Sequence, residues 1–169
     1  MHTMKTQAPD AIDLLDADHL AVHALFQSYR ELVRTCAGGL QRRALAEEIC
    51  MELTIHARLE EELFYPAVRE GLNDDELMDE ADDTHAGQRE VIVQILSGSP
   101  DDPLYDARMA ALAGHVERHV RQEREQVFNR ALASRLDLQS LGHSIAVRKE
   151  ELRAVSDALR EDALASAHA

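Results

Sequence analysis

Apolar residues recur at intervals of three and four along five stretches of the chain, which is the period of an α-helix with one buried face. In the first stretch this stripe includes Ile12, Leu15, Val22 and Phe26. Glycine, proline and acidic residues separate the stretches, and no stretch alternates in the manner of a β-strand. The sequence therefore predicts an all-α protein with helices at residues 10–36, 41–70, 73–96, 102–133 and 137–161.

Local signals refine the helix ends. The third helix is expected to open at Asn73, and the fourth to have Asp102 as its N-cap and Pro103 as its first residue. Pro66 lies near the end of the second helix. It is expected to kink the last turn, because its ring displaces the carbonyl group of Glu62.

The first four helices are long and are joined by short connections, a pattern typical of an up-down-up-down four-helix bundle. We assign residues 10–134 to this bundle, residues 1–9 to a flexible N-terminus and residues 135–169 to an additional C-terminal helix with a tail. This fifth helix is expected to cap one end of the bundle or to mediate a dimer. One side of it is apolar and carries Leu141, Ile145, Leu152, Val155 and Leu159.

The motif His-x-x-x-Glu occurs twice in the chain, and a lone histidine precedes each copy, by 37 residues in the first half and 34 in the second. Side chains four residues apart share one face of a helix, and every residue of this set falls on an otherwise apolar stripe. Since neighbouring helices run antiparallel, the four histidines are expected to lie at a similar depth. The set is His19, His56, Glu60, His85, His119 and Glu123.

These six residues point to a two-metal site. A single His-x-x-x-Glu is usually a surface contact, but a buried carboxylate is costly unless it is paired or bound to a metal ion. The repetition of the motif in register favours metal ligation. Imidazole suits zinc, copper, iron and nickel, bridging carboxylates suit iron or manganese, and the lack of thiolate ligands argues against structural zinc. The spacing by itself leaves the choice of metal open.

At these residues the chain closely resembles the bacterial hemerythrin-like family, which carries the HHE cation-binding domain. The resemblance implies a four-helix bundle around a non-haem di-iron centre with an oxo or hydroxo bridge, and makes zinc or manganese less expected occupants. It also implies that the four histidines are ligands and that Glu60 and Glu123 bridge the irons. The matching segments are residues 14–26, 55–70, 84–92, 99–112 and 117–128.

The chain departs from the oxygen-carrying members of this family, which resemble five-histidine sites. Arg89 stands four residues after His85, where those proteins have the fifth histidine. His23 and His115 each lie one turn from a predicted ligand and are candidates to replace it. Asn129 stands where the family usually has proline, a change expected to affect helix shape more than chemistry.

Other residues are candidates for a supporting role. Asp16 and Asp82 each precede a lone histidine by three residues, and either carboxylate could accept the outer imidazole N–H, although solvated acids are an equal alternative. Glu61 and Glu90, which adjoin proposed site residues in the sequence, are weaker candidates. Tyr29 and Tyr65 could stabilise a bound oxygen species, but ordinary core packing is favoured for both.

Composition argues against several classes of partner. The chain has 32 acidic and 18 basic residues and a formal charge of −14, which disfavours binding to nucleic acid or to an anionic membrane. No run approaches the roughly 20 apolar residues of a transmembrane helix, and the N-terminal residues lack the apolar core of a secretory signal. The two cysteines lie outside any CxxC motif. We therefore expect reduced thiols and a cytoplasmic location.

The expected function is the binding or reduction of a small ligand, such as O₂, NO or H₂O₂, in oxidative or nitrosative stress. The missing fifth histidine leaves more open metal positions and favours turnover over reversible carriage, while enzymatic activity itself stays open. One alternative is an iron-sensing or iron-storage protein without redox turnover. Another is a metal-free interaction bundle that uses the fifth helix.

Overall fold

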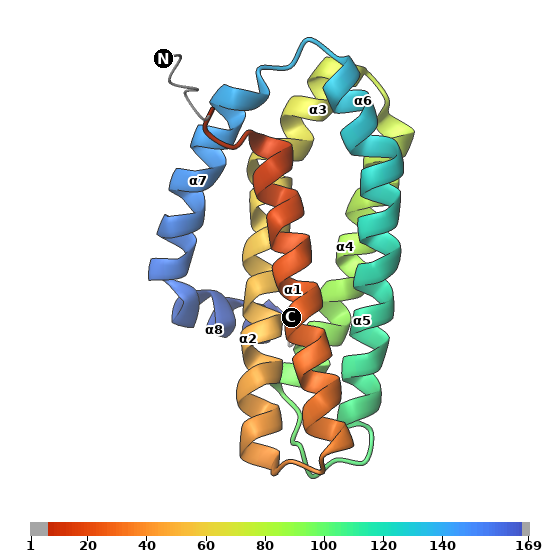
Figure 1. Cartoon of the computed structure of the whole chain (residues 1–169), viewed down its shortest axis with the longest axis vertical. Coiled ribbons are helices and arrows are strands. Elements are labelled where there is room, and N and C mark those ends of the chain that lie inside the picture. Colours follow the sequence, from red (N-terminus) through yellow and green to blue (C-terminus); the bar gives the residue numbers. More distant parts are fainter. Residues whose placement is uncertain (1–6, 167–169) are drawn as a thin grey trace, which may run out of the picture.

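The computed structural model describes residues 7–166, which fold into an all-helical bundle (Figure 1). Most of the N-terminal segment expected to be flexible, and the last three residues of the tail, lie outside the described residues. The bundle is built from α1 (Ala11–Arg34), α2 (Gly39–Leu59), α4 (Asp75–Leu96) and α5 (Tyr105–Gln122). These four long helices lie side by side and confirm the predicted hemerythrin-like bundle.

Two of the long helices continue through a wider, π-helical turn. After α2 come η1 (Glu60–Phe64) and α3 (Tyr65–Leu72), and after α5 come η2 (Glu123–Phe128) and α6 (Asn129–Ala133). The sequence predicts a kink at Pro66 in the last turn of this helix. The structure instead has a π turn that begins at Glu60, six residues before Pro66. A π turn moves the carbonyl groups out of the path of the proline ring.

The second half makes the same turn without proline. The side-chain amide of Asn129 donates a hydrogen bond of 3.1 Å to the carbonyl of Glu125, four residues earlier. This carbonyl would otherwise lose its helical partner in the widened turn. Both halves thus begin a π turn at the equivalent glutamate, but the turn that lacks proline is one residue longer, six residues against five.

Two predicted helix starts are corrected. Asn73 does not open α4 but ends α3 in a left-handed conformation (φ 51°), and the carboxylate of Asp74 caps α4 by accepting the N–H of Leu77. Asp102 and Pro103 lie in a turn before α5, which begins at Tyr105. The Asp102 carboxylate accepts the N–H of Leu104 at 2.9 Å, so it organises this turn instead of capping the helix.

The predicted fifth helix is two helices, α7 (Leu138–Ala154) and α8 (Ser156–Ser166), separated at Val155. Val155 is 50% exposed and does not belong to the apolar side assigned to it. The α7 helix packs along α1 and α2, whereas α8 turns across α2 and α4 (Figure 1). At Gly142 a Cβ atom would lie 2.8 Å from the backbone of Ala11, so the close approach of α7 to α1 requires glycine.

The apolar core consists of two clusters with a buried polar layer between them. One cluster contains Leu15, Leu59 and Phe64 near the π turns, and the other contains Phe26 and Leu112 toward the opposite end of the bundle. No helix within residues 7–166 has the length and apolar character needed to cross a bilayer. In this polar layer the helical period brings histidine and glutamate side chains inward, and the layer contains the candidate site.

Candidate metal centre

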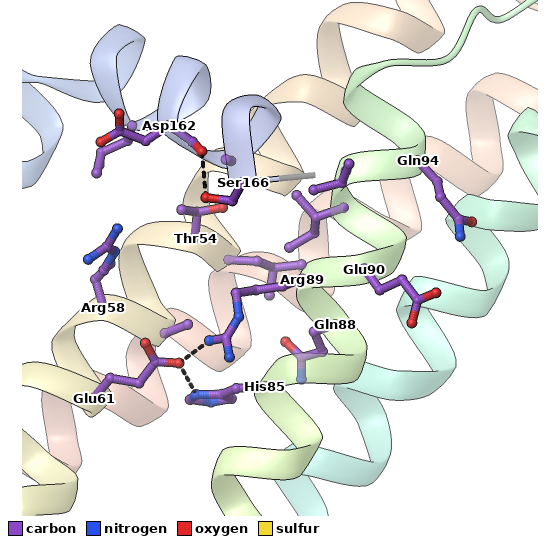
Figure 2. A pocket seen from close by; sticks show the side chains of 16 residues that line it. Thr54, Arg58, Glu61, His85, Gln88, Arg89, Glu90, Gln94, Asp162 and Ser166 are labelled. Carbon is purple, nitrogen blue, oxygen red and sulfur yellow. Dashed lines mark hydrogen bonds and ion pairs between the residues drawn. The ribbon is translucent and has the colours of Figure 1, made fainter. Parts of the chain in front are cut away.

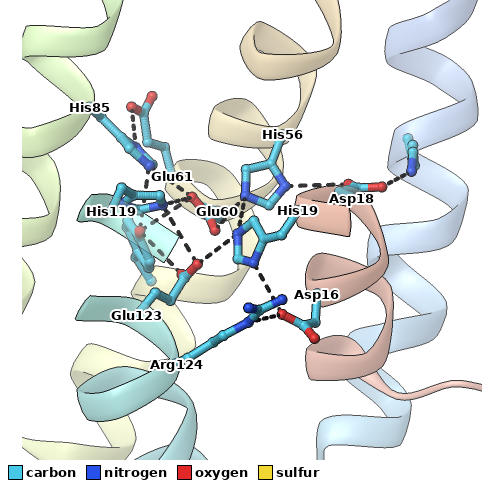
Figure 3. Close-up of polar contacts among 12 residues, drawn as sticks. Asp16, Asp18, His19, His56, Glu60, Glu61, His85, His119, Glu123 and Arg124 are labelled. Atoms are coloured by element: carbon cyan, nitrogen blue, oxygen red, sulfur yellow. Dashed lines mark hydrogen bonds and ion pairs between the residues drawn. The ribbon is translucent and has the colours of Figure 1, made fainter. Parts of the chain in front are cut away.

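The structure brings all six predicted ligand residues into this polar layer, where each residue is at most 5% exposed (Figure 3). One histidine comes from each long helix, and the two glutamates begin the two π turns. One ligand atom from each of five residues lies within 4.8 Å of the others; these five are His19, His56, Glu60, His119 and Glu123.

His85 completes the set from the α4 side. Its Nε2 atom lies 2.8 Å from a carboxylate oxygen of Glu60, which also contacts His119 at 3.6 Å. Glu60 therefore touches histidines from three helices, because its other oxygen lies 2.9 Å from Nε2 of His56. Glu123 reaches the remaining histidine, His19, at 3.1 Å.

The donor set fits a cation. The Nε2 atoms of His19 and His56 face each other at 3.0 Å, although each carries a lone pair when its outer nitrogen holds the proton. Within residues 7–166, Nε2 of His119 and one oxygen each of Glu60 and Glu123 are buried without a hydrogen bond of acceptable geometry. The two oxygens nevertheless lie only 2.9 Å and 3.1 Å from Nε2 of His56 and His19. Lone pairs that converge in a dry interior repel one another unless protons or metal ions lie between them.

The pKa directions indicate the same need for positive charge. Burial raises the pKa of both carboxyl groups, but His56, His119 and His85 outweigh burial at Glu60 and hold its pKa well below the usual value. At Glu123, burial and the nearby charge of Glu60 leave the pKa raised. The centre thus favours one ionised glutamate and resists a second negative charge unless a cation enters.

The outer nitrogen of three histidines contacts a carboxylate. The structure places Asp16 as the sequence predicted, with Oδ1 at 3.3 Å from Nδ1 of His19, and Arg124 donates to the same oxygen at 2.6 Å. A metal-bound histidine usually has such an acceptor for its other N–H. The acceptor fixes the tautomer, so that the Nε2 lone pair points into the cluster.

Asp82 does not take the corresponding place beside His85. Its carboxylate is exposed and contacts Arg69 at 3.3 Å. Glu61, which the sequence ranked lower, instead lies 3.1 Å from Nδ1 of His85 and is also paired with Arg89. Glu61 follows Glu60 at the start of η1, so its proximity to His85 depends on how the α2–η1 segment packs against α4.

The sequence analysis missed Asp18. Its carboxylate lies 3.3 Å from Nδ1 of His56 and is also paired with Lys149 from α7. Burial raises the pKa of Asp18, but hydrogen bonds from His56 and Lys149 outweigh it and lower the pKa. A signal was present, because residue 18 is three residues after Leu15 and therefore falls on the inward stripe of α1.

Tyr65 is also part of the site. Its hydroxyl lies 3.2 Å from Glu60, 3.3 Å from Glu123 and 3.5 Å from Nε2 of His85. The favoured interpretation of ordinary packing was therefore incomplete. Burial and the two carboxylates raise the pKa of Tyr65 well above its usual value, so the hydroxyl keeps its proton. In the second half Phe128 stacks on His19, with ring centroids 5.9 Å apart, and offers no hydroxyl.

The remaining candidates lie outside the cluster. Tyr29 donates to Asp106 at 2.6 Å, far along α1. His23 is exposed and contacts Gln27, and the structure pairs His115 with Arg118. Neither histidine is brought to the place of a fifth ligand, and Arg89 is 56% exposed in its pair with Glu61.

Fold and site together define a helical-bundle protein with a buried histidine and glutamate cluster suited to metal ions. Residues 10–131 match the model of the hemerythrin HHE cation binding domain, and the chain belongs to this family. The fold is shared with the crystal structure of a hemerythrin HHE cation binding domain-containing protein from Mycobacterium kansasii. That structure matches with a TM-score of 0.73 at 24% identity and covers 92% of this chain and 99% of its own.

A second similarity is to a protein described as a DNA nickase from Nostoc sp. (strain PCC 7120). It is 31% identical over 117 residues, which is 69% of this chain. The chain spans about a third of the length of that relative, 32%, so the two share one region and not a whole architecture.

Proposed function

We propose that the chain is a non-haem di-iron protein that binds and consumes a small oxidant or radical, such as H₂O₂ or NO, as part of a stress response. The observation that carries this proposal is the convergence of four imidazoles and two carboxylates in one buried layer, where three of their atoms make no hydrogen bond of acceptable geometry within residues 7–166. The mixed nitrogen and oxygen donor set suits iron.

Each residue would have a distinct task. The four histidines and two glutamates would hold the metal ions, and bound iron would supply the redox chemistry. The two apolar clusters would exclude water and large substrates from the layer. The Tyr65 hydroxyl would hold a proton between Glu60 and Glu123, since it lies within 3.3 Å of both carboxylates.

Turnover is favoured over reversible O₂ carriage for a structural reason. Arg89 occupies the sequence position of the fifth histidine and pairs with Glu61 at the surface. His23 and His115 have partners elsewhere. Six protein ligands for two metal ions leave several positions for an external ligand.

The test begins with the protein as purified from cells. We expect two irons per chain by elemental analysis, oxo-bridge charge-transfer bands in the optical spectrum, and consumption of H₂O₂ or NO. A stable, reversible oxygen adduct without peroxide consumption would refute turnover. Helix loss on chelation without any redox activity would support iron sensing or storage. If the purified protein contains no metal, and if replacing His56 and Glu60 does not impair the protein, the chain is a metal-free bundle.

The substitution Tyr65→Phe tests the role of the hydroxyl. The Phe128 position shows that the second half accommodates a ring without the oxygen. We expect unchanged iron content, shifted charge-transfer bands and roughly tenfold slower peroxide or NO consumption, in line with about one lost hydrogen bond. Tyr29→Phe is the matched control, because its hydroxyl contacts Asp106 outside the layer. Equal effects of the two substitutions would contradict a role for Tyr65 in turnover.

A further inference from the structure

A cavity of about 480 Å³ lies between α2, α4 and the C-terminal helix α8, beside the metal centre (Figure 2). The bundle contributes the aliphatic side chains of Leu53, Ile92 and Val93 to its wall, beside several polar and charged side chains. The α8 helix forms the roof with Leu159 and Ala163. A volume of this size lies in the range of small-molecule sites, about 300–1,000 Å³.

The cavity contains one polar group that lacks a partner. Gln88 lines it, is 4% exposed, and its amide nitrogen has no hydrogen-bond partner within residues 7–166. A buried amide donor is costly unless an acceptor reaches it. Gln88 lies one helical turn after His85, which also lines the cavity, as Figure 2 shows.

The charged groups around the cavity are already balanced or exposed. Arg89 is paired with Glu61, and Arg58 lies 3.9 Å from Glu62. Glu90 and Asp162 also line the cavity, and both are exposed to solvent. No charged side chain among the described lining residues is both buried and unpaired, so the cavity is not built for an ion.

We propose that this cavity binds a small uncharged organic molecule with an apolar body and a carbonyl-type oxygen, which accepts a hydrogen bond from the Gln88 amide. The aliphatic walls contact the body of the ligand, and α8 closes over it. The ligand also contacts His85, so its binding affects the outer edge of the histidine and glutamate cluster. This inference does not depend on the identity of the metal.

Two bicyclic probes of nearly equal size test the proposal: 1-tetralone, which has one carbonyl group, and tetralin, which has none. Binding is measured by equilibrium dialysis against the full chain as purified. We expect 1-tetralone to bind about tenfold more tightly than tetralin, as one buried hydrogen bond predicts. In Gln88→Leu this preference should vanish while tetralin binds as before.

Two tryptophan substitutions on α8 provide the location control. Ala163→Trp should fill the cavity and abolish binding of both probes, whereas Ala165→Trp, on the exposed side of the same helix, should leave binding unchanged. Circular dichroism of each variant shows whether it folds. Equal affinity of the wild type for the two probes, a preference that persists in Gln88→Leu, or binding that survives in Ala163→Trp would overturn the proposal. Probe binding by chain purified without metal would support the cavity inference independently of the di-iron proposal, which the metal analysis and the His56 and Glu60 substitutions test separately.

Discussion

Three of the four clustered histidines hold their outer nitrogen against a carboxylate that is itself paired with a cation. The carboxylate fixes the imidazole tautomer, and the cation keeps the carboxylate ionised and in place. The three chains of contact are His19–Asp16–Arg124, His56–Asp18–Lys149 and His85–Glu61–Arg89. Arg89 therefore supports His85, a predicted ligand, through Glu61, at the position where the sequence analysis expects the fifth histidine of an oxygen carrier.

At this scale, Glu61→Ala should weaken metal retention by about 10–100-fold, because His85 loses the acceptor that orients it. The matched control is Asp82→Ala, which removes a carboxylate that contacts only Arg69 among the described residues. Metal content after dialysis against a competing chelator provides the measurement. If Asp82→Ala loses as much metal as Glu61→Ala, the assignment of Glu61 is wrong.

At the scale of the elements, the two π turns decide where the glutamates lie. Each turn starts at the glutamate that enters the cluster, Glu60 or Glu123, and each is followed by a regular helix. A π turn accommodates one extra residue and shifts the face that the following helix presents. The turns thus allow the glutamates to face the centre while α3 and α6 still bury Val68 and Ala131 in the core.

The widened turn should tolerate proline at a position that an α-helix would not. We expect Asn129→Pro to lower the free energy of unfolding by about 2 kcal/mol, because it removes the backbone hydrogen bond to Gln126 and the side-chain hydrogen bond to the Glu125 carbonyl. Arg118→Pro, in the regular part of α5, should cost about 3 kcal/mol or more. Chemical denaturation measures the free energy of unfolding of both variants. Similar losses of stability in the two would show that the π turn does not tolerate proline better than an α-helix does.

At the scale of the whole molecule, the metal centre is a polar layer between two apolar clusters, so its charge balance affects the stability of the entire bundle. Without metal, burial lowers the pKa of His85, but Glu60 and Glu61 outweigh burial and raise it to about 9. The pKa of His56 is also raised well above its usual value. Protonated imidazoles thus supply, in the metal-free protein, the positive charge that metal ions would bring.

Metal removal should therefore make stability fall as pH rises. A histidine with a raised pKa in the folded state contributes stability that is fully present below its unfolded value, about 6.5, and is lost through pH 9. We expect urea unfolding of the metal-free chain to show lower stability at pH 9 than at pH 6.5. The metal-loaded chain should be more stable at both and lack this fall, because metal replaces the protons. A metal-free chain that gains stability over this range would contradict the charge balance.

The six-residue cluster and the bundle were predictable because both depend on the helical period. Residues such as His56 and Glu60 share a face in any α-helix, so their position on an apolar stripe was enough to place them inside. Helix ends were less predictable. The sequence predicts that a helix starts at Asn73, but Asn73 ends α3 in a left-handed conformation. The neighbouring residue, Asp74, is the N-cap of α4 instead.

Contacts between helices were decided by the tertiary structure alone. Whether Glu61 or Asp82 accepts the N–H of His85 depends on the distance and rotation between α2 and α4, which the period within one helix does not contain. The same holds for Tyr65, which reaches both glutamates only through the π turn, and for the cavity under α8. Sequence by itself determined which side chains face inward; the packing of helices determined which of them meet.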